Sequence, residues 1–388
     1  MKHISERERD LPSSVIGKLL KISAERHDII SLGAGEPDFD TPKPLLKSIK
    51  KIVSNYKKNH LTHYSAPEGI LELRDALVKK IQRDNKIHTT PDNVLVTTGS
   101  QEGLFAGFLA TLDPTEEVLI QNPGYLGYLP AIELVSAVPR YVRLKEEENF
   151  EINPDRIKKL ITKKTRVIVL NTPANPTGTV IRRSILEEIA DIAVENDLYI
   201  FSDEAYEKFT YGQKAHVSIG SFNGMDKYVV TFQTFSKSYA MCGFRLGYAI
   251  GPRDVIQAMQ KSIHYITICP PHISQLVGMK ALSLSEKYVA QMRKEYYRRR
   301  TMIVRRLNDM GLETQMPDGA FYTFSNITRY SNNSQKFAAK LLKETKVAVV
   351  PGTEFGRHGE GYIRCSYATD YRLIQYAMDR LEKFLKRK

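Results

Sequence analysis

One lysine of this chain is placed where an amine is able to act as a nucleophile. Lys237 follows an apolar predicted strand, residues 228–232, and lies among hydroxyl side chains. Lysine is rarely buried, and partial desolvation or a nearby cation lowers the pKa of its ammonium group, which frees the lone pair for imine formation. Thr234, Ser236 and Arg245 are suited to bind an anion. The segment therefore indicates a covalent site for an aldehyde cofactor that carries a phosphate, with a solvated lysine at a strand end as the alternative.

The composition places limits on the class of protein. The 388 residues predict two domains, or one large α/β domain with an appendage. No apolar run approaches the roughly 20 residues of a membrane span, and residues 1–10 carry charges of both signs without an apolar signal core. The three cysteines lack C-x-x-C spacing, which argues against a disulfide framework and a zinc site. We therefore expect a cytoplasmic protein without metal ions or membrane contacts.

The formal net charge of +13 is compatible with nucleic-acid binding. In the densest basic run, residues 293–306, apolar residues recur at helical spacing between the charges. This pattern is typical of an amphipathic helix with a solvated basic face. We therefore predict no nucleic-acid partner, and a basic surface that concentrates anionic substrates and a phosphorylated cofactor.

Short apolar strands alternate with helical segments between about residue 70 and residue 250. This alternation predicts an α/β fold with a mainly parallel central sheet that is covered by helices on both faces. The predicted strands of this part cover residues 94–98, 118–120, 166–170, 198–201, 228–232 and 246–250.

A different pattern begins near residue 285 and predicts a smaller α+β domain with strands at 320–324, 347–350 and 362–366. We expect it to be completed by the N-terminal segment, in which Val15, Leu19, Leu20 and Ile22 have helical spacing. The expected division is an arm at 1–15, a large cofactor-binding domain at 46–284, and a small domain made of 16–45 with 285–388.

Polar residues follow the carboxyl ends of the predicted strands, which is the edge of an open α/β sheet where ligands bind. Gly99, Ser100 and Gln101 stand between a strand and a helix, where free N–H groups and the helix dipole favour an anion. Asp203 follows the strand at 198–201. A buried carboxylate there needs a cationic or N–H partner, such as a protonated pyridine nitrogen, or else it caps a following helix.

Two further residues complete the set of candidates. Asn175 lies in the turn between a strand and a helix, where its amide is able to bond a phenolate oxygen, although the turn is also an ordinary one. Arg364 lies inside an apolar strand. Its planar guanidinium fits a carboxylate through two parallel hydrogen bonds, and an internal ion pair is the alternative.

Taken together, these residues resemble the pyridoxal-phosphate-dependent aminotransferases of fold type I, class I/II, in the aspartate aminotransferase superfamily. The chain is similar to the archaeal branch that includes aromatic and broad-specificity enzymes, and the resemblance covers nearly its whole length in order. The matching motifs are the turn at 35–39, Tyr64 with Gly69, the Gly99 loop, residues 123–125, the turn at 175–178, residues 203–206, Ser236-Lys237 with Arg245, and Arg364 with Ser366.

The resemblance implies a role for each residue around a bound pyridoxal phosphate. Lys237 would hold the cofactor as an internal aldimine and move the proton between the substrate Cα and the cofactor C4′. Asp203 would keep the pyridine nitrogen protonated, so that the ring accepts electrons. Tyr206 and Asn175 would bond the ring hydroxyl oxygen, and Tyr125 would stack on the ring.

The same resemblance implies how the anionic groups are bound. Arg364, with the Gly35 N–H group and Asn175, would bind the substrate carboxylate. Tyr64 would reach the phosphate of the cofactor in the neighbouring subunit, which implies an obligate homodimer with shared active sites. The phosphate would be held by hydroxyls, N–H groups and one guanidinium, from Gly99, Ser100, Gln101, Thr234, Ser236 and Arg245.

The implied reaction is ping-pong transfer of an amino group from an L-amino acid to a 2-oxo acid, with 2-oxoglutarate the expected acceptor. Dicarboxylate enzymes of the superfamily use an extra cation for the side-chain carboxylate, and neither Gln101 nor residues 264–271 supply a lysine or arginine for it. Tyr265, Ile266 and Ile268 are instead suited to line an apolar pocket. We therefore expect aromatic or broad specificity, with an aspartate aminotransferase and a C–S β-lyase of the same fold as alternatives.

Overall fold

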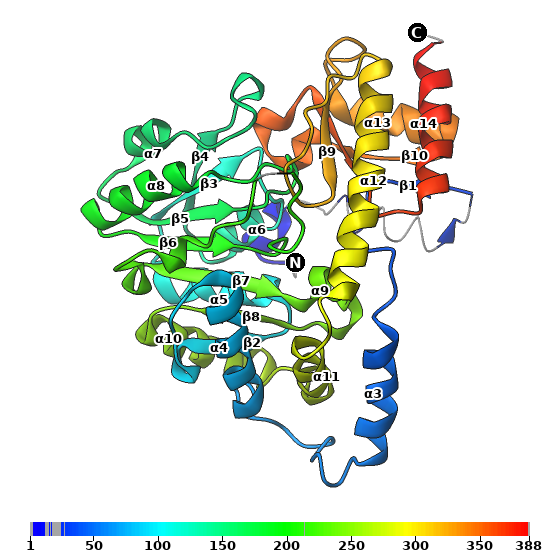
Figure 1. Ribbon diagram of the computed structural model, residues 1–388. Coiled ribbons are helices and arrows are strands. Elements are labelled where there is room, and N and C mark those ends of the chain that lie inside the picture. Colours follow the sequence, from blue (N-terminus) through cyan, green and yellow to red (C-terminus); the bar gives the residue numbers. More distant parts are fainter. Residues whose placement is uncertain are drawn as a thin grey trace.

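The computed structural model describes residues 3–11, 15, 17, 25, 26, 28–212 and 214–386. A seven-stranded sheet, with strand order β2-β8-β7-β6-β5-β3-β4, forms the centre of its larger part (Figure 1). In this sheet β8 runs in the direction opposite to all the other strands. The predicted α/β fold with a mainly parallel sheet is therefore confirmed. The strands are β2 (Val94–Thr97), β3 (Glu117–Asn122), β4 (Val138–Arg143), β5 (Thr165–Asn171), β6 (Tyr199–Asp203), β7 (Val229–Thr234) and β8 (Gly247–Ile250).

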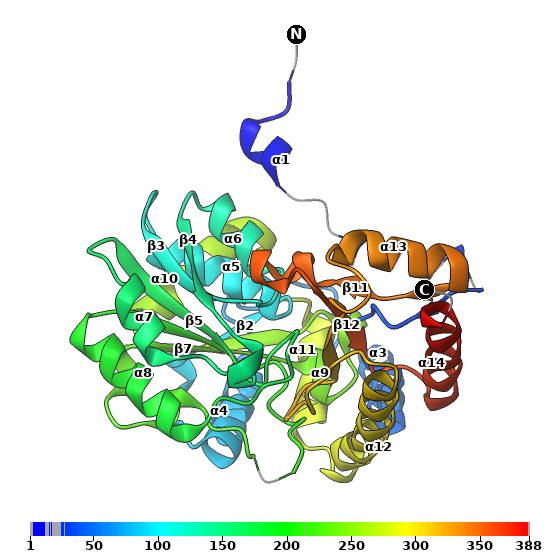
Figure 2. The same ribbon diagram turned by 90° about the horizontal axis from the view of Figure 1, so that it is seen from above.

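Helices cover both faces of this sheet because its central strands are apolar on both sides (Figures 1 and 2). In β5, Val167 and Val169 share a hydrophobic cluster with Phe108 of α5, whereas Ile168 and Leu170 share another with Leu186 of α8. Successive side chains of a strand point to opposite faces, so each face receives its own helices. These helices are α4 (Leu71–Asn85), α5 (Ser100–Thr111), α6 (Tyr128–Leu134), α7 (Pro154–Leu160), α8 (Arg183–Glu195), α10 (Arg253–Thr267) and α11 (His272–Leu282).

The smaller part contains an antiparallel sheet of β11 (Val350–Pro351), β12 (Tyr362–Ser366) and β9 (Tyr322–Asn326). Beside it, β1 (Ile30–Ser31) pairs in parallel with β10 (Val347–Ala348). The pairing joins the N-terminal segment to the C-terminal one. The division into an arm, a large domain and a small domain stays a prediction. The helices here are α12 (Lys287–Asp309), α13 (Ser334–Thr345) and α14 (Tyr371–Leu385). The helix α3 (Lys43–Ser54) packs on the larger part, because its Leu45 and Ile52 share a hydrophobic cluster with Val277 of α11.

Two strands differ from the sequence-based expectation. The predicted strand at 347–350 is divided, because Val347 and Ala348 pair with β1 whereas Val350 and Pro351 pair with β12 in another sheet. The strand β4 was not predicted. It is the last strand at one edge of the large sheet, and it contains Pro139, a residue that strands accept mainly at such edges.

The segment predicted as an N-terminal arm contains the short helix α1 (Glu6–Asp10). The Ser5 side chain caps this helix by accepting a hydrogen bond from the Glu8 N–H group at 3.3 Å. Leu19, Leu20 and Ile22, on which the next predicted helix depends, lie outside the described residues. No helix in the described part of the chain is long and apolar enough to cross a membrane.

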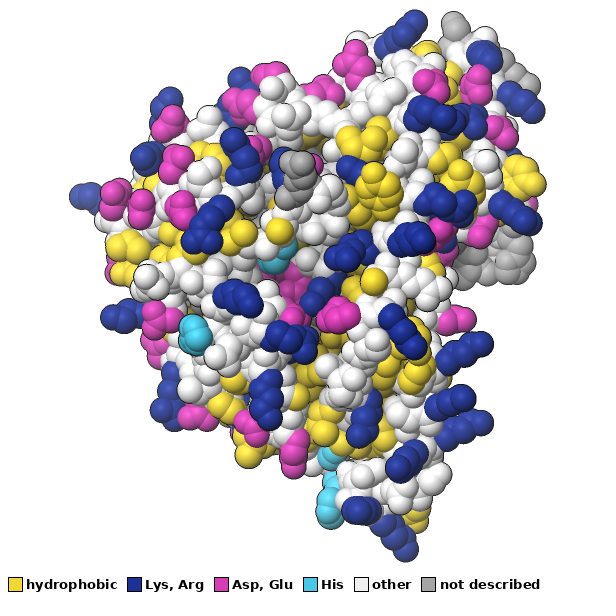
Figure 3. Space-filling view, in the orientation of Figure 1, with side chains coloured by type: hydrophobic (Ala, Val, Ile, Leu, Met, Phe, Trp, Pro, Cys, Tyr) yellow, Lys and Arg dark blue, Asp and Glu magenta, His cyan; other side chains and the backbone are white. Residues whose placement is uncertain are grey.

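The long basic helix α12 has the predicted amphipathic form, since Met292, Tyr296 and Ile303 are buried. Its basic face is only partly solvated, because Arg299 and Arg300 are also buried. The Arg299 guanidinium pairs with Asp38 and Glu295, and that of Arg300 donates to the Pro317 carbonyl oxygen. On the face shown in Figure 3, Lys and Arg side chains are spread among acidic ones.

Candidate active site

A cavity of about 270 Å³ lies at the carboxyl ends of β5, β6 and β7. The structure brings the predicted catalytic, cofactor-binding and carboxylate-binding residues to its wall, except Tyr64. The large part supplies the phosphate-binding candidates and also Asp203 and Lys237. Gly35 and Arg364 come from the segments that form and surround the smaller sheets. The predicted residues are therefore close in space although they span positions 35 to 364 of the chain.

Lys237 lies in the short helix α9 (Phe235–Ser238), which begins directly after β7. The Thr234 side chain caps this helix by accepting a hydrogen bond from the Ser236 N–H group at 3.1 Å. The Lys237 Nζ atom donates a hydrogen bond to the Gly35 carbonyl oxygen at 2.6 Å. The amine is thereby held inside the cavity instead of extending into solvent, which contradicts the alternative of a solvated lysine.

The phosphate-binding candidates surround the N-terminus of α5. Gly99 precedes this helix with φ 80°, and a Cβ atom at Gly99 would lie 2.6 Å from an Nη atom of Arg245. Glycine therefore allows the guanidinium to lie directly against the loop. The hydroxyl groups of Thr234 and Ser236, 2.9 Å apart, line the same cavity. Free N–H groups, hydroxyls and a guanidinium together form an anion site.

Asp203 is the last residue of β6, and its side chain is buried. Its two oxygens accept hydrogen bonds from the Tyr128 hydroxyl at 2.7 Å and from the Ala205 N–H group at 3.2 Å. Burial raises the pKa of Asp203 to about 6, although these two hydrogen bonds favour the ionised form. The segment after Asp203 forms a turn and no helix. One oxygen of the Asp203 carboxylate therefore stabilises the turn by accepting from the Ala205 N–H group. Because the carboxylate is buried, a cationic partner in the cavity would stabilise its ionised form.

Arg364 is fully buried in β12 and has no carboxylate partner among the described residues. Its Nη atoms donate to Asn175 Oδ1 at 3.0 Å and to the Gly33 carbonyl oxygen at 2.7 Å. Its Nε atom has no hydrogen-bond partner in the part of the chain that the structure describes. Burial lowers the pKa of Arg364. The alternative of an internal ion pair is wrong, and the arginine has an open donor for an anion.

Tyr125 and Gln101 form one side of the cavity. The Tyr125 hydroxyl donates a hydrogen bond to Gln101 Oε1 at 2.9 Å, and its ring meets that of Tyr128 edge-on at 5.3 Å. Burial raises the pKa of Tyr125 to about 12, so the hydroxyl stays protonated. The Gln101 side chain is thus engaged with Tyr125, which leaves its backbone N–H group as the part that is suited to an anion.

Sequence reasoning missed Tyr128 and Tyr322. Tyr128 lies in α6, and its hydroxyl donates a hydrogen bond to Asp203. Tyr322 is the first residue of β9 and lines the cavity. The hydroxyl groups of Tyr322 and Tyr206 are 2.8 Å apart. The only sequence signal for Tyr322 was a phenol within a strand that was otherwise expected to be apolar, and Tyr128 gave none because its helix was not predicted.

Tyr64 lies outside the cavity, and 77% of its surface is exposed. It lines a separate surface pocket with Cys269 and Pro270. The residues predicted to form an apolar substrate pocket, Tyr265, Ile266 and Ile268, are also exposed and do not line the cavity of their own chain. One chain therefore does not bring these four side chains to its own site.

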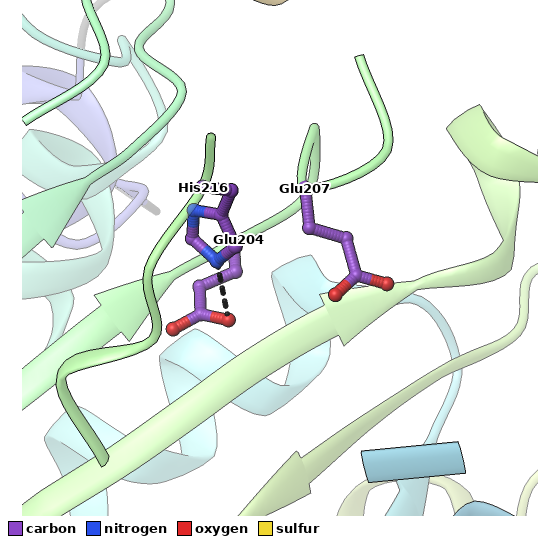
Figure 4. A group of neighbouring side chains, drawn as sticks. All are labelled: Glu204, Glu207 and His216. Carbon is purple, nitrogen blue, oxygen red and sulfur yellow. Dashed lines mark hydrogen bonds and ion pairs between the residues drawn. The ribbon is translucent and has the colours of Figure 1, made fainter. Parts of the chain in front are cut away.

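A polar cluster begins at Glu204, the residue after Asp203. It contains three side chains that are close enough together to hold a metal ion, Glu204, Glu207 and His216 (Figure 4). The His216 Nε2 atom and Glu204 Oε2 are 2.9 Å apart. Lys80 forms an ion pair with Glu207, and Asn85 Nδ2 donates to Glu204 and Glu207 at 3.1 and 2.7 Å. The carboxylates are thus already satisfied by an ammonium and an amide, and the cluster is an internal ion-pair network.

The fold, with Lys237, Asp203 and Arg364 around one cavity, defines a class of enzyme to which known proteins also belong. Residues 27–381 match the model of the family "Aminotransferase class I and II". An aspartate aminotransferase of Pyrococcus abyssi is 45% identical over 378 residues, which cover 97% of this chain and 96% of the relative. An aromatic-amino-acid aminotransferase 2 of Thermococcus litoralis is 43% identical over 388 residues, or 99% of each chain.

A solved structure agrees with these relatives. The aromatic aminotransferase of Pyrococcus horikoshii OT3 superposes with a TM-score of 0.90 at 43% identity, covering 96% of this chain and 99% of that chain. The chain belongs to the aminotransferase class I and II family. The predicted enzyme class, a pyridoxal-phosphate-dependent transaminase, is thereby confirmed.

Proposed function

We propose that the cavity binds pyridoxal phosphate and transfers amino groups between L-amino acids and 2-oxo acids. The supporting observation is that Lys237 lies in one cavity with an anion site, a buried carboxylate and a buried guanidinium that has an open donor. When bound, the cofactor supplies an electrophilic carbon and an electron-accepting ring. The residues present therefore fit each polar group of this cofactor.

The phosphate would be held at the N-terminus of α5, by the N–H groups of Ser100 and Gln101, the hydroxyls of Thr234 and Ser236, and Arg245. Gly99 leaves room for this anion. Asp203 would hold a proton on the ring nitrogen, since a buried carboxylate favours a cationic partner. The hydroxyl of Tyr206 and the amide of Asn175 would bond the ring oxygen, and Tyr125 would cover the ring.

Lys237 would carry the covalent link and move the proton at the substrate Cα. Its Nζ atom is held by the Gly35 carbonyl oxygen at 2.6 Å, so the amine faces the segment that also contains the proposed carboxylate contact, the Gly35 N–H group. Arg364 would bind the α-carboxylate through its open Nε donor. The two groups that a transamination needs, a base and a carboxylate clamp, are thus supplied by different parts of the chain.

Aromatic or broad donor specificity is the form of this function that the cavity favours. Among the described residues, its only basic side chains are Lys237, Arg245 and Arg364. With these assigned to the link, the phosphate and the α-carboxylate, none is left for a second substrate carboxylate, and Glu36 adds a negative charge. Aspartate remains the second candidate donor because the relative from Pyrococcus abyssi carries the name aspartate aminotransferase.

A homodimer with shared active sites fits the exposed residues. Tyr64, Tyr265, Ile266 and Ile268 are apolar or aromatic and lie on the surface, and Tyr64 shares a surface pocket with residues 269–272. A second copy of the chain would cover them and bring Tyr64 toward the phosphate of its cofactor. Sedimentation equilibrium should then give twice the chain mass, and Tyr64→Ala should weaken cofactor binding; a monomer with full activity would contradict the proposal.

The cytoplasm is the proposed compartment. Cys242, Cys269 and Cys365 are free, as expected for a chain in a reducing environment. Fractionation of cells that express the protein, with detection of the protein by antibody in each fraction, tests this compartment directly. Recovery with the membrane or the secreted fraction would contradict it.

Steady-state rates with a panel of amino donors and 2-oxoglutarate test the reaction. Aromatic donors should give the highest kcat/KM, and a clear preference for aspartate would overturn the proposed specificity. Glutamate alone should convert the bound cofactor to pyridoxamine phosphate. A C–S β-lyase would instead release pyruvate and ammonia from a cysteine conjugate, so product analysis distinguishes the two reactions.

A further inference from the structure

We propose that Tyr322 is a positioning residue that joins the tyrosine beside the cofactor oxygen to the arginine that binds the substrate carboxylate. The inference rests on the proposed function of Tyr206 and Arg364. Tyr322 is fully buried and lines the cavity, yet it belongs neither to the phosphate site nor to the covalent link. Its hydroxyl and its ring face two different functional side chains.

The hydroxyl contact is with Tyr206. The two phenol oxygens are 2.8 Å apart, and either is able to donate. Burial, followed by the charge and the hydrogen bond of Tyr322, raises the pKa of Tyr206 well above its usual value. If Tyr206 donates to the ring oxygen of the cofactor, its own oxygen is left to accept from Tyr322. The order of donation is then Tyr322 to Tyr206 to the cofactor, and each hydrogen bond in such a chain strengthens the next.

The ring contact is with Arg364. Tyr322 and Arg364 lie on paired antiparallel strands, in which Tyr322 is opposite Ser366 and Arg364 is opposite Phe324. This diagonal placement brings the guanidinium carbon 4.3 Å from the centre of the Tyr322 ring. A cation over an aromatic face is stabilised most strongly when both are desolvated. The ring therefore fixes the plane of a guanidinium whose Nε atom is open.

Gly35 shows that the position of the Tyr322 hydroxyl is constrained from a third side. A Cβ atom at Gly35 would lie 2.9 Å from the Tyr322 hydroxyl oxygen, and the Gly35 carbonyl oxygen holds Lys237. Tyr322 is thus packed between the segment that orients the amine and the two side chains it contacts. One phenol sets the positions of groups that serve both the cofactor and the substrate.

The test separates the hydroxyl from the ring. Tyr322→Phe keeps the ring, so it should raise the pH midpoint of the bound cofactor's visible absorbance by about 0.5 to 1 pH unit, because the ring oxygen loses stabilisation. The matched control is Tyr367→Phe, which removes a buried hydroxyl that bonds the Ala320 carbonyl oxygen outside the cavity wall. This control should leave the midpoint unchanged.

Tyr322→Leu removes the ring as well. It should weaken binding of a 2-methyl amino acid, which carries the carboxylate but has no Cα proton to lose, by about 10-fold, whereas Tyr322→Phe should change this Kd by less than about 2-fold. Both are measured by spectral titration of the holoenzyme. Equal Kd values for the Phe and Leu variants would contradict the role of the ring.

A double variant guards against a purely structural effect. In a Tyr206→Phe background the hydroxyl chain is already broken, so adding Tyr322→Phe should not move the midpoint further. A shift of the same size in both backgrounds, or a shift no larger than that of Tyr367→Phe, would overturn the proposal. If the wild-type protein bound no cofactor at all, the proposed function itself would fail, which is a distinct outcome.

Discussion

The Lys237 Nζ atom and the Gly35 carbonyl oxygen are 2.6 Å apart although 202 residues separate them in the sequence. Lys237 follows a strand of the large sheet, whereas Gly35 lies shortly after β1, which pairs with the C-terminal half of the chain. This hydrogen bond holds the amine in the cavity at the point where the two parts of the molecule meet.

Replacing Arg364 with lysine should impair the use of amino acids far more than the use of simple amines. A lysine at position 364 would lack the planar guanidinium and its open Nε donor. The value of kcat/KM for an amino acid should therefore fall by about 30- to 1000-fold, the equivalent of about 2 to 4 kcal/mol. The half-reaction of an amine without a carboxylate should change little. An equal loss with both substrates would show that Arg364 does not contact the carboxylate.

Gly99→Ala should weaken cofactor binding by crowding Arg245. The new Cβ atom would lie 2.6 Å from an Nη atom of this arginine, so we expect the Kd for pyridoxal phosphate to rise by at least about 10-fold, or about 1.4 kcal/mol. Gly224→Ala is a control for a positive φ without crowding, because Gly224 has φ +79° and no neighbour within 4 Å; its ψ of −4° is left-handed, whereas Gly99 has ψ 162°. An equal loss of cofactor affinity in both variants would contradict the assignment to crowding of Arg245.

Asp203→Asn should stabilise the cofactor-free protein at high pH while it abolishes most activity. The pKa of Asp203 in the folded protein is raised from 3.8 to about 6, so the ionised carboxylate destabilises the fold above pH 6. This cost disappears as the pH falls from about 6 toward 4. Removing it should raise the free energy of unfolding at pH 8 by up to about 3 kcal/mol, with little difference near pH 4, as measured by urea denaturation.

Asp84→Asn should change the free energy of unfolding in the opposite direction to Asp203→Asn. The pKa of Asp84 is lowered from 3.8 to about 2, because its hydrogen bonds to Arg83 and Lys208 outweigh burial. Its ionised form therefore stabilises the fold above pH 4, and this contribution is lost as the pH falls through about 2. The Asn variant should be less stable than the wild type at pH 8. If both Asn variants changed stability in the same direction, the assignment to burial would be wrong.

The sequence was sufficient to predict the residues that stand at strand ends. Lys237 and Asp203 are charged side chains at the ends of apolar strands, and Arg364 is a charged side chain inside one. The conflict between charge and burial is visible at all three positions without a structure. Tyr128 and Tyr322 could not be found this way. Their hydroxyl partners, Asp203 and Tyr206, are 75 and 116 residues away, and a tyrosine beside an apolar segment is as well explained by packing.

The errors in the fold have similar physical origins. The continuous apolar run at 347–350 predicts one strand, but the chain changes partner at Val349 and joins two sheets. The strand β4 contains two exposed arginines and a proline, a composition that indicates an edge strand only once its neighbour is known. Tyr64 and Tyr265 are exposed in one chain, so a role for them depends on a second copy.

The covalent role of Lys237 is the central claim, and reduction of the holoenzyme tests it most directly. Sodium borohydride converts an imine between lysine and pyridoxal phosphate to a stable amine, which proteolysis and mass spectrometry then assign to one peptide. The pyridoxyl mass should be found on Lys237, and Lys237→Ala should carry no label and show no transamination. Label on another lysine of the wild-type protein, or near-normal turnover by the alanine variant, would contradict the account.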